Sequence, residues 1–398
     1  MEPFIIANPP VGIYRGDMPL GYAYLHTLLD IYARFKRSTG REVSSHRYSL
    51  NVLGKRAENL GLNGTVEDLH RYAKEWIDRN KIRNRMGLSL EGSLLDSDQD
   101  SIHNAQEVFL QLDKKGYLIR RGHTFYLDIP KINTSIDVQG IASQIRFYPA
   151  RAENEFKRMI IASKCPIRLT KDRIYAAKNP LLGEPLSPIF VVSNIWESIY
   201  NREVDLISSG EKEMSRYLLL RFYSIVATSD NLPMKEVFIY NLIEPIEGTD
   251  AWNLEFLLNS GVDSDSLRYA FVKSHSLTQQ KTQLDKKKLI MGKNFVYLVG
   301  NIKNFFLRQK EKMNLSIPQE DRTYDTEMDE FRFNHVLSNL EKKFHNISSE
   351  IQAAKKRDEA VRFINKNFAE YIKTVRKLFP FCPFIADKVL KDLEIAKA

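Results

Sequence analysis

The chain has 398 residues, of which 43% are hydrophobic and 27% charged, so it is long enough for two or three folded domains. Lysine and arginine outnumber aspartate and glutamate by 59 to 50, and the formal net charge of +9 suits an anionic partner without specifying one. With only two cysteines, Cys165 and Cys382, a disulfide framework and a multi-cysteine zinc site are excluded. No apolar run approaches the roughly 18 residues of a membrane span, and no secretory signal is visible. We therefore expect a cytoplasmic protein.

The N-terminal segment predicts a strand, a loop and a helix. Residues 4–7 are an apolar run that ends at Asn8 before two prolines, which is typical of a buried parallel strand. Apolar residues then recur at three- and four-residue spacing over 22–36, and Gly40 ends this predicted helix. Strand, loop and helix in this order form the beginning of a βαβ unit.

The remaining chain separates into an α/β part and a helical part. Helices are predicted at 65–83, 103–115 and 211–227, and Thr65 with Asp68 forms a capping box for the first. Short strands are predicted around 119–130, 188–192 and 237–240. Later helices are predicted at 262–273, 285–310, 325–348, 355–379 and 383–396. We expect the first half of an α/β domain at 1–118, an insertion at 119–185, the second half at 186–262 and a helical domain at 263–398.

Several phrases then indicate a known family. The stretch ANPPVGIYRGDMPLGYAYLHTLLDIYARFKRSTG, residues 7–40, resembles the opening of class I aminoacyl-tRNA synthetases, nearest to the methionyl type. Residues 165–173, 190–194, 261–269 and 378–386 resemble later phrases of the same family in the same order. The resemblance implies an α/β fold with a Rossmann-like parallel sheet. It also implies that a reduced, zinc-free insertion splits this sheet, and that an all-α, anticodon-binding-like helical bundle follows.

The two phosphate-binding motifs of the family are degenerate in this chain. The family's His-x-Gly-His tetrad aligns with Pro19-Leu20-Gly21-Tyr22, which keeps the glycine and loses both histidines. The second motif, whose lysines clamp pyrophosphate in the family, aligns with residues 246–250, where Glu247 and Asp250 replace cations. The loss of both motifs predicts that ordinary methionine activation is lost. Whether ATP with Mg²⁺, the cofactor implied by the resemblance, is still used stays open.

The alignment also gives a set of candidate site residues, each of which has a plain packing or surface alternative. Tyr22 could replace a lost hydrogen-bond donor, and His26 lies one helical turn further on, so both are candidate catalytic residues. Candidate nucleotide- or substrate-binding residues are Asn8, Pro10, Arg15, Asp17, Pro19, Gly21, Asn51, Gly54, Asn194, Tyr217 and Trp252. Candidate tRNA-binding residues are Lys286, Lys287, Lys288, Lys355, Lys356 and Arg357. No metal-binding residue is predicted, and we expect the ligand crevice at the carboxyl ends of the strands, at the switch point of the sheet.

Three functional hypotheses follow from the resemblance and its departures. The first is a repurposed enzyme of specialised metabolism, which forms an amide, an ester or an N–N bond precursor on an amino acid or an aminoacyl-tRNA. The second is a non-catalytic pseudo-synthetase that binds tRNA or a protein. The third is a divergent, authentic methionyl-tRNA synthetase. The sequence leaves the amino acid, the acceptor and the oligomeric state open.

Overall fold

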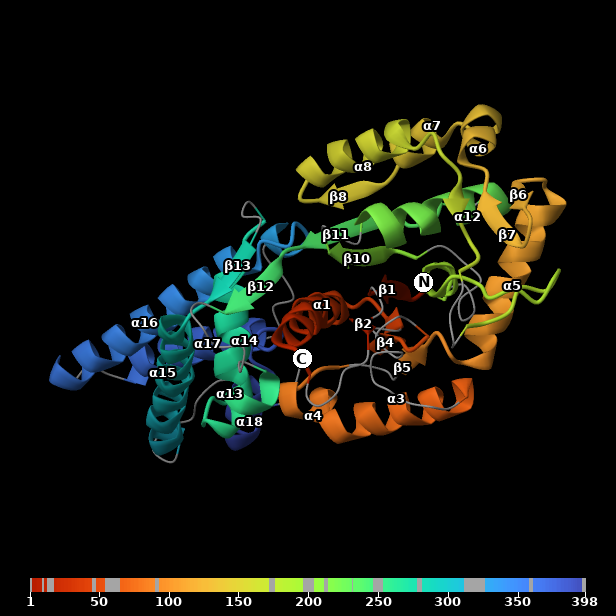
Figure 1. Cartoon of the computed structure of the whole chain (residues 1–398). Coiled ribbons are helices and arrows are strands. Elements are labelled where there is room, and N and C mark those ends of the chain that lie inside the picture. Colours follow the sequence, from red (N-terminus) through yellow and green to blue (C-terminus); the bar gives the residue numbers. More distant parts are fainter. Residues whose placement is uncertain are drawn as a thin grey trace. The chain divides into compact units, whose positions relative to one another are not determined.

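The computed structural model consists of two compact units (Figure 1). Unit 1 comprises Met1–Asp17, Val43–Lys81 and Leu90–Tyr240, and unit 2 comprises Met18–Glu42, Ile82–Ser89 and Asn241–Ala398. The structure describes residues 2–8, 11–12, 18–44, 48–53, 65–89, 93–171, 176–195, 204–210, 214–230, 232–245, 253–277, 281–310, 326–357 and 361–395. Within these ranges no helix is both long and apolar enough to cross a membrane.

Unit 1 is built on a five-stranded sheet in which every neighbouring pair is parallel. Its order is β3-β1-β10-β11-β8, with β3 at Val43–Ser44, β1 at Phe4–Ala7, β10 at Leu206–Gly210, β11 at Glu236–Tyr240 and β8 at Arg146–Tyr148. Because β3 pairs with one side of β1 and β10 with the other, the switch point lies between β1 and β10. The predicted α/β class with a Rossmann-like parallel sheet is confirmed.

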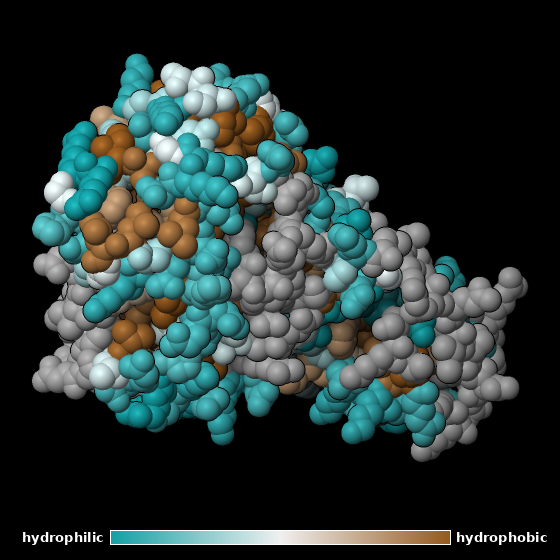
Figure 2. Space-filling model, turned by 90° about the vertical axis from the view of Figure 1, so that its right-hand side faces the viewer, coloured by the Kyte–Doolittle hydropathy of each residue, from teal (hydrophilic) through white to brown (hydrophobic). Residues whose placement is uncertain are grey.

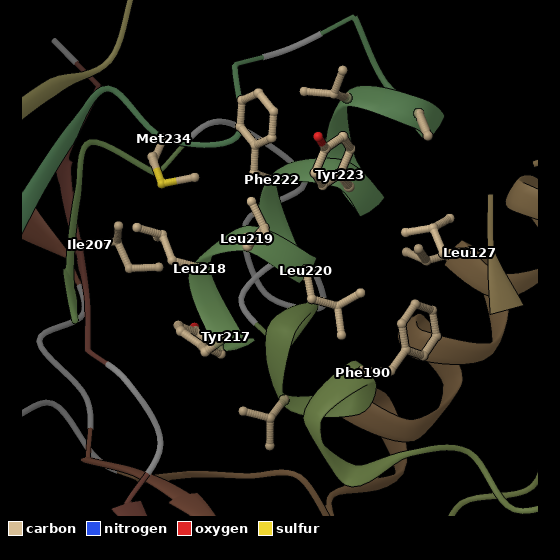
Figure 3. Close-up of a cluster of buried hydrophobic side chains, with 14 of the residues drawn as sticks. Leu127, Phe190, Ile207, Tyr217, Leu218, Leu219, Leu220, Phe222, Tyr223 and Met234 are labelled. Atoms are coloured by element: carbon tan, nitrogen blue, oxygen red, sulfur yellow. The ribbon is translucent and has the colours of Figure 1, made fainter. Parts of the chain in front are cut away.

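The core of unit 1 lies where helices pack beside this sheet. Helices α5 (Gln99–Lys114), α9 (Pro188–Ser193) and α12 (Leu219–Thr228) contact one another, and the π-helix η1 (Met214–Leu218) leads directly into α12. Figure 3 shows Leu218 of η1 beside Ile207 of β10, and Leu220 of α12 near Phe190 and Leu127. Burial of this apolar face is the main favourable contribution to the stability of the unit.

One sequence expectation for unit 1 needs correction. Residues 188–193 form the short helix α9 rather than a strand, because Pro188 at its first turn presets helical φ, and an apolar run this short does not distinguish the two states. The segment 119–185 contains α6 (Ile129–Ser135), α7 (Val138–Ala142) and α8 (Arg151–Ala162), and it also supplies β8 to the main sheet.

Unit 1 also contains two three-stranded sheets. In the first, β2 (Val11–Gly12), β4 (Tyr48–Asn51) and β5 (Ser93–Leu95) are parallel. In the second, β6 (Leu118–Arg121) and β7 (Thr124–Leu127), where short strands are predicted, form an antiparallel hairpin that β9 (Ile167–Arg168) extends. Helix α3 (Val66–Asn80) begins with the predicted capping box between Thr65 and Asp68.

Unit 2 is mostly helical, as predicted. It contains α1 (Leu20–Ser38), α4 (Ile82–Met86), α13 (Leu254–Asn259), α14 (Ser264–Ser274), α15 (Lys286–Lys310), α16 (Phe333–Arg357), α17 (Val361–Leu378), α18 (Pro383–Asp392) and the 3-10 helix η2 (Thr326–Met328). The strands β12 (Leu242–Pro245) and β13 (Lys281–Leu284) form a parallel pair. Helix α1 contacts α14 and α4. In the C-terminal bundle, α15 contacts α16 and α18, and α17 contacts α16 and α18.

A buried ion pair holds the helices of unit 2 together. The Asp30 carboxylate on α1 and the Arg268 guanidinium on α14 lie 2.8 Å apart, and neither side chain is exposed. Arg268 also donates to the backbone carbonyls of Phe381 at 2.7 Å, Pro380 at 2.7 Å and Met86 at 3.2 Å. One guanidinium therefore joins α1, α4, α14 and the turn before α18.

Among the residues that Figure 2 draws in colour, hydrophobic residues lie in several groups between hydrophilic ones. Large hydrophobic side chains that are exposed include Ile161, Leu181 and Leu182 in unit 1 and Ile290, Tyr297 and Phe384 in unit 2. Scattered exposed apolar residues of this kind are normal for folded proteins.

Candidate active site

Buried polar groups without partners lie at the switch point of the main sheet. Asn8 directly follows β1, whose last residue, Ala7, pairs with Ile207 of β10, and Ser208 is the next residue of β10. Both side chains are fully buried, and neither the Asn8 amide nor the Ser208 hydroxyl has a hydrogen-bond partner in the described part of the chain. Most buried polar groups in proteins are paired, so these two groups, one directly after β1 and one within β10, indicate a place that a ligand completes.

A second polar group lies at the end of α9 in the same unit. The side-chain amide nitrogen of Asn194 donates to the Phe190 carbonyl at 2.8 Å, while its amide oxygen has no partner among the residues described. The backbone carbonyl of Asn194 accepts a bond of 2.6 Å from the side chain of Asn104. Ser193 adjoins η1, since its hydroxyl lies 3.4 Å from the carbonyl of Tyr217, a buried residue of that helix. Because η1 contacts both α9 and β10, it links Asn194 with the strand that carries Ser208.

Asp96 fixes the backbone that follows β4. Its carboxylate accepts the backbone N–H of Val52 at 2.6 Å and that of Leu53 at 3.2 Å. Complete burial raises the pKa of Asp96 to about 8, and the two N–H groups oppose this rise by stabilising the charged form. This carboxylate therefore holds the backbone that follows Asn51, the last residue of β4; the Asn51 side chain lies outside the described atoms.

Unit 2 contains the residues that align with the first catalytic motif. Pro19 precedes α1 and forms an antiparallel bridge with Asn253, which follows the segment that aligns with the second motif. Gly21 and Tyr22 lie in the first turn of α1 and are half-buried, whereas His26 is fully buried. A Cβ on Gly21 would meet nothing closer than Ile243 at 4.0 Å, so space remains beside the backbone of that glycine. The bridge thus joins the first residue of the first aligned motif to Asn253, while the second aligned segment, 246–250, lies outside the described residues.

The described side chains of this motif do not fit a polyphosphate. From Pro19 to Tyr22 none carries a cation or an imidazole, and the His26 imidazole is removed from solvent. Charge-assisted donors are what a phosphate requires, and a proline or leucine side chain supplies none. These residues therefore offer no charged group to the phosphates of ATP.

Other candidate residues are placed only in part. Pro10, Arg15, Asp17, Gly54 and Trp252 lie outside the described residues, as do the side chains of Lys355, Lys356 and Arg357 at the end of α16. Lys286 and Lys287 are exposed in the first turn of α15, whereas Lys288 donates to the Gln283 carbonyl at 2.8 Å. Among the described residues, no group of three or more histidines, cysteines or carboxylates could hold a metal ion.

Sequence reasoning missed Asp96 and the ion pair between Asp30 and Arg268. The signal for Asp30 was a carboxylate on the apolar face of the predicted helix 22–36, between Leu29 and Ile31. Charged residues are almost never fully buried unless they are paired, so such a position predicts a buried partner. Asp96 had no comparable signal, because its acceptor role depends on backbone more than 40 residues away.

Comparisons with known proteins point to one class. No protein-family profile matches the chain. Valine–tRNA ligase of Methanococcus maripaludis is 28% identical over 191 residues, which cover 41% of this chain and 20% of that relative. Leucine–tRNA ligase of Bartonella bacilliformis is 30% identical over 113 residues, which cover 27% of this chain and 12% of that relative. The chain thus spans a fifth or less of the length of these curated relatives.

Solved structures give a likeness over the whole chain. Mycobacterium tuberculosis methionyl-tRNA synthetase in complex with methionyl-adenylate has a TM-score of 0.80 at 12% identity, over 100% of this chain and 94% of that one. The apo form of that enzyme gives 0.72 at 12% identity. The chain is therefore a class I aminoacyl-tRNA synthetase-like protein, as its sequence phrases indicated. Its fold is that of the methionyl-tRNA synthetases.

Proposed function

We propose that this protein binds an amino acid at the switch point of unit 1 and joins its acyl group to an acceptor, without ordinary methionine activation. The observation that carries the proposal is the pair of unpartnered, fully buried groups at that point, the Asn8 amide and the Ser208 hydroxyl. An amide can donate to a carboxylate and accept from an ammonium, and a hydroxyl can do either. Uncharged groups of this kind suit a zwitterionic amino acid.

Energetics support a ligand at this point. An unsatisfied buried polar group costs about 1–3 kcal/mol, and a polar ligand that bonds to the Asn8 amide and the Ser208 hydroxyl would remove this cost. Asn194 adds another unpartnered amide oxygen in the same unit. Three neutral polar groups without partners among the described residues fit selective binding of a small polar molecule better than a purely structural role.

The chemistry follows from the missing phosphate clamp. A ready-made aminoacyl ester of tRNA needs no ATP for further transfer. An acceptor amine attacks the ester carbonyl, a C–N bond forms, and the C–O bond to the ribose breaks. The amine proton is transferred to the leaving ribose oxygen.

Ligand binding can be tested before any activity is known. Thermal shifts of the purified protein against the amino acids should identify at least one that raises the melting temperature, because a ligand that binds the folded state stabilises it. Asn8→Ala should remove that shift, whereas Asn154→Ala, an exposed amide on α8 of the same unit, should keep it. Absence of any shift, or an equal shift in both variants, would contradict the site.

The reaction is tested separately. The protein is mixed with aminoacyl-tRNA and a small amine in the absence of ATP, and the amide product is measured by mass spectrometry. Transfer that requires Asn8 supports the proposal, and transfer only when ATP and free amino acid are added refutes the ATP-independent route. Weaker tRNA binding after substitution of the exposed Lys286 and Lys287 by alanine, with a smaller salt dependence, would support contact of α15 with tRNA.

A divergent methionyl-tRNA synthetase is the second candidate, and the whole-chain likeness to that fold favours it. The solved relative binds methionyl-adenylate, and an authentic enzyme would form the same intermediate here. Methionine-dependent exchange of labelled pyrophosphate into ATP would establish this candidate and exclude the first. Binding of tRNA without exchange and without transfer would leave the non-catalytic pseudo-synthetase.

A further inference from the structure

Unit 1 contains a cleft at the end of α8, next to β9 and the start of α12. Its volume is about 390 Å³, and we call it the Cys165 cleft after the exposed thiol on its wall. The cleft lies on the outer side of η1. Tyr217 of that helix is buried in the core, whereas Ser215 and Arg216, which directly precede it, are exposed and line the cleft. Figure 3 shows the inner side, where Tyr217 and Leu218 lie near β10.

Three cations from different elements converge on this cleft. Lys164 precedes β9, Arg168 ends it, and Arg216 lies in η1; all three are exposed. A bond of 2.6 Å from Nε of Arg168 to the Thr170 carbonyl orients its guanidinium. None of the three forms an ion pair with a carboxylate in the described part of the chain, and none of the described lining residues is acidic. The cleft is therefore complementary to an anion with several oxygens.

The floor of the cleft is apolar. Ile167 and Ile189 are half-buried, and Leu219 and Leu220 reach it from the core. The hydroxyls of Ser187 and Ser215 lie on its walls. A phosphate suits the cations, and a flat ring suits the aliphatic floor, so the combination matches a nucleotide better than inorganic phosphate or a simple carboxylate.

We propose that the Cys165 cleft binds a nucleoside monophosphate, with its phosphate between Lys164, Arg168 and Arg216 and its base against Ile167 and Leu219. The proposal goes beyond the amino-acid crevice, because it concerns other residues of unit 1 and needs no catalytic activity.

The Cys165 thiol allows binding in this cleft to be measured by chemical labelling. Cys165 is exposed in the cleft, and the only other cysteine, Cys382, is fully buried in unit 2. Burial also raises the pKa of the Cys382 thiol, which keeps it unreactive in the folded protein. Native labelling with N-ethylmaleimide, an uncharged reagent, therefore measures access to the cleft alone.

The experiment compares the labelling rate of Cys165 with and without AMP. Because only the free cleft reacts, AMP at ten times its dissociation constant should slow labelling about tenfold. Lys164→Ala combined with Arg216→Ala should reduce this protection to less than twofold. Lys114→Ala, which removes an exposed lysine of α5 in the same unit, should leave it unchanged.

Three further arms decide the ligand class. Adenosine and inorganic phosphate should each protect much less than AMP, and equal protection by phosphate would overturn the nucleotide assignment. Protection by a short single-stranded RNA but not by AMP would also overturn it, in favour of an RNA contact. No protection by millimolar AMP, or equal protection in the double variant, would overturn the site itself. Protection that persists in Asn8→Ala separates this result from the fate of the proposed function.

Discussion

The buried pair of Asp30 and Arg268 should be the largest single determinant of the stability of unit 2. Both side chains are fully buried, and the carboxylate also accepts Nε of Arg34 at 2.9 Å and the backbone N–H of Ser89 at 2.6 Å. Replacing Asp30 with asparagine leaves the buried Arg268 without its counter-charge. Removal of one partner of a buried pair costs about 3–5 kcal/mol, and we expect Asp30→Asn near the upper end.

Arg268→Met should cost somewhat less, although it also breaks bonds to three carbonyls. Asp30 keeps Arg34 as an ionic partner, whereas the carbonyls of Phe381, Pro380 and Met86 lose their donor. We therefore expect about 3 kcal/mol. The double variant should lose less than the sum of the single losses, by about 0.5–3 kcal/mol, because no isolated charge remains buried.

Cys382 provides an assay local to unit 2. It follows directly after the Phe381 carbonyl that Arg268 binds, and it is fully buried. After Cys165 has been blocked, pulse labelling of Cys382 across a urea gradient gives the unfolding free energy of this unit. Arg332→Met is the matched control, because its pair with Glu330 leaves both side chains 51% exposed and should contribute about 0–1 kcal/mol. If Arg268→Met resembled this control, or if the single losses simply added, the reasoning would be refuted.

Three further predictions concern other positions. Burial raises the folded pKa of Asp96 to about 8, above its unfolded value of about 4. Its contribution to the free energy of unfolding is therefore fully present below pH 4 and is lost as the pH rises to 8. Urea titrations at several pH values should show this loss for the native chain and for Asp113→Asn but not for Asp96→Asn. Gly292→Ala should destabilise α15 by about 1–3 kcal/mol, since its Cβ would overlap a backbone carbonyl, whereas Gly300→Ala in open space on that helix should stabilise it by up to about 1 kcal/mol in thermal melts. Asn8→Leu should keep or raise stability while abolishing amino-acid binding, and a loss above about 2 kcal/mol would argue that Asn8 is structural.

The local elements were largely predictable because their signals are local. The spacing of apolar residues predicted α1, α3, α15 and the mostly helical region after residue 262. Thr65 and Asp68 predicted a capping box that the structure confirms. The strand predicted at 188–192 was wrong, because a short apolar run fits a helix and a strand equally well and tertiary packing selects one of them. For the candidate site, the sequence predicted a location at the carboxyl ends of the strands and named Asn8, but it did not predict Ser208.

The sequence by itself determined the class of fold and the loss of the phosphate-binding side chains at Pro19 and Tyr22, since both depend on residue identity at fixed places in the chain. Only the tertiary structure decided which polar groups meet. Parallel pairing of β1 with β10 joins Ala7 to Ile207, the residues that precede Asn8 and Ser208, and helix packing buries Asp30 against Arg268, 238 residues further on. It also gathers Lys164, Arg168 and Arg216 around one cleft. These contacts depend on the register of strands and the packing of helices, and apolar periodicity alone does not specify either.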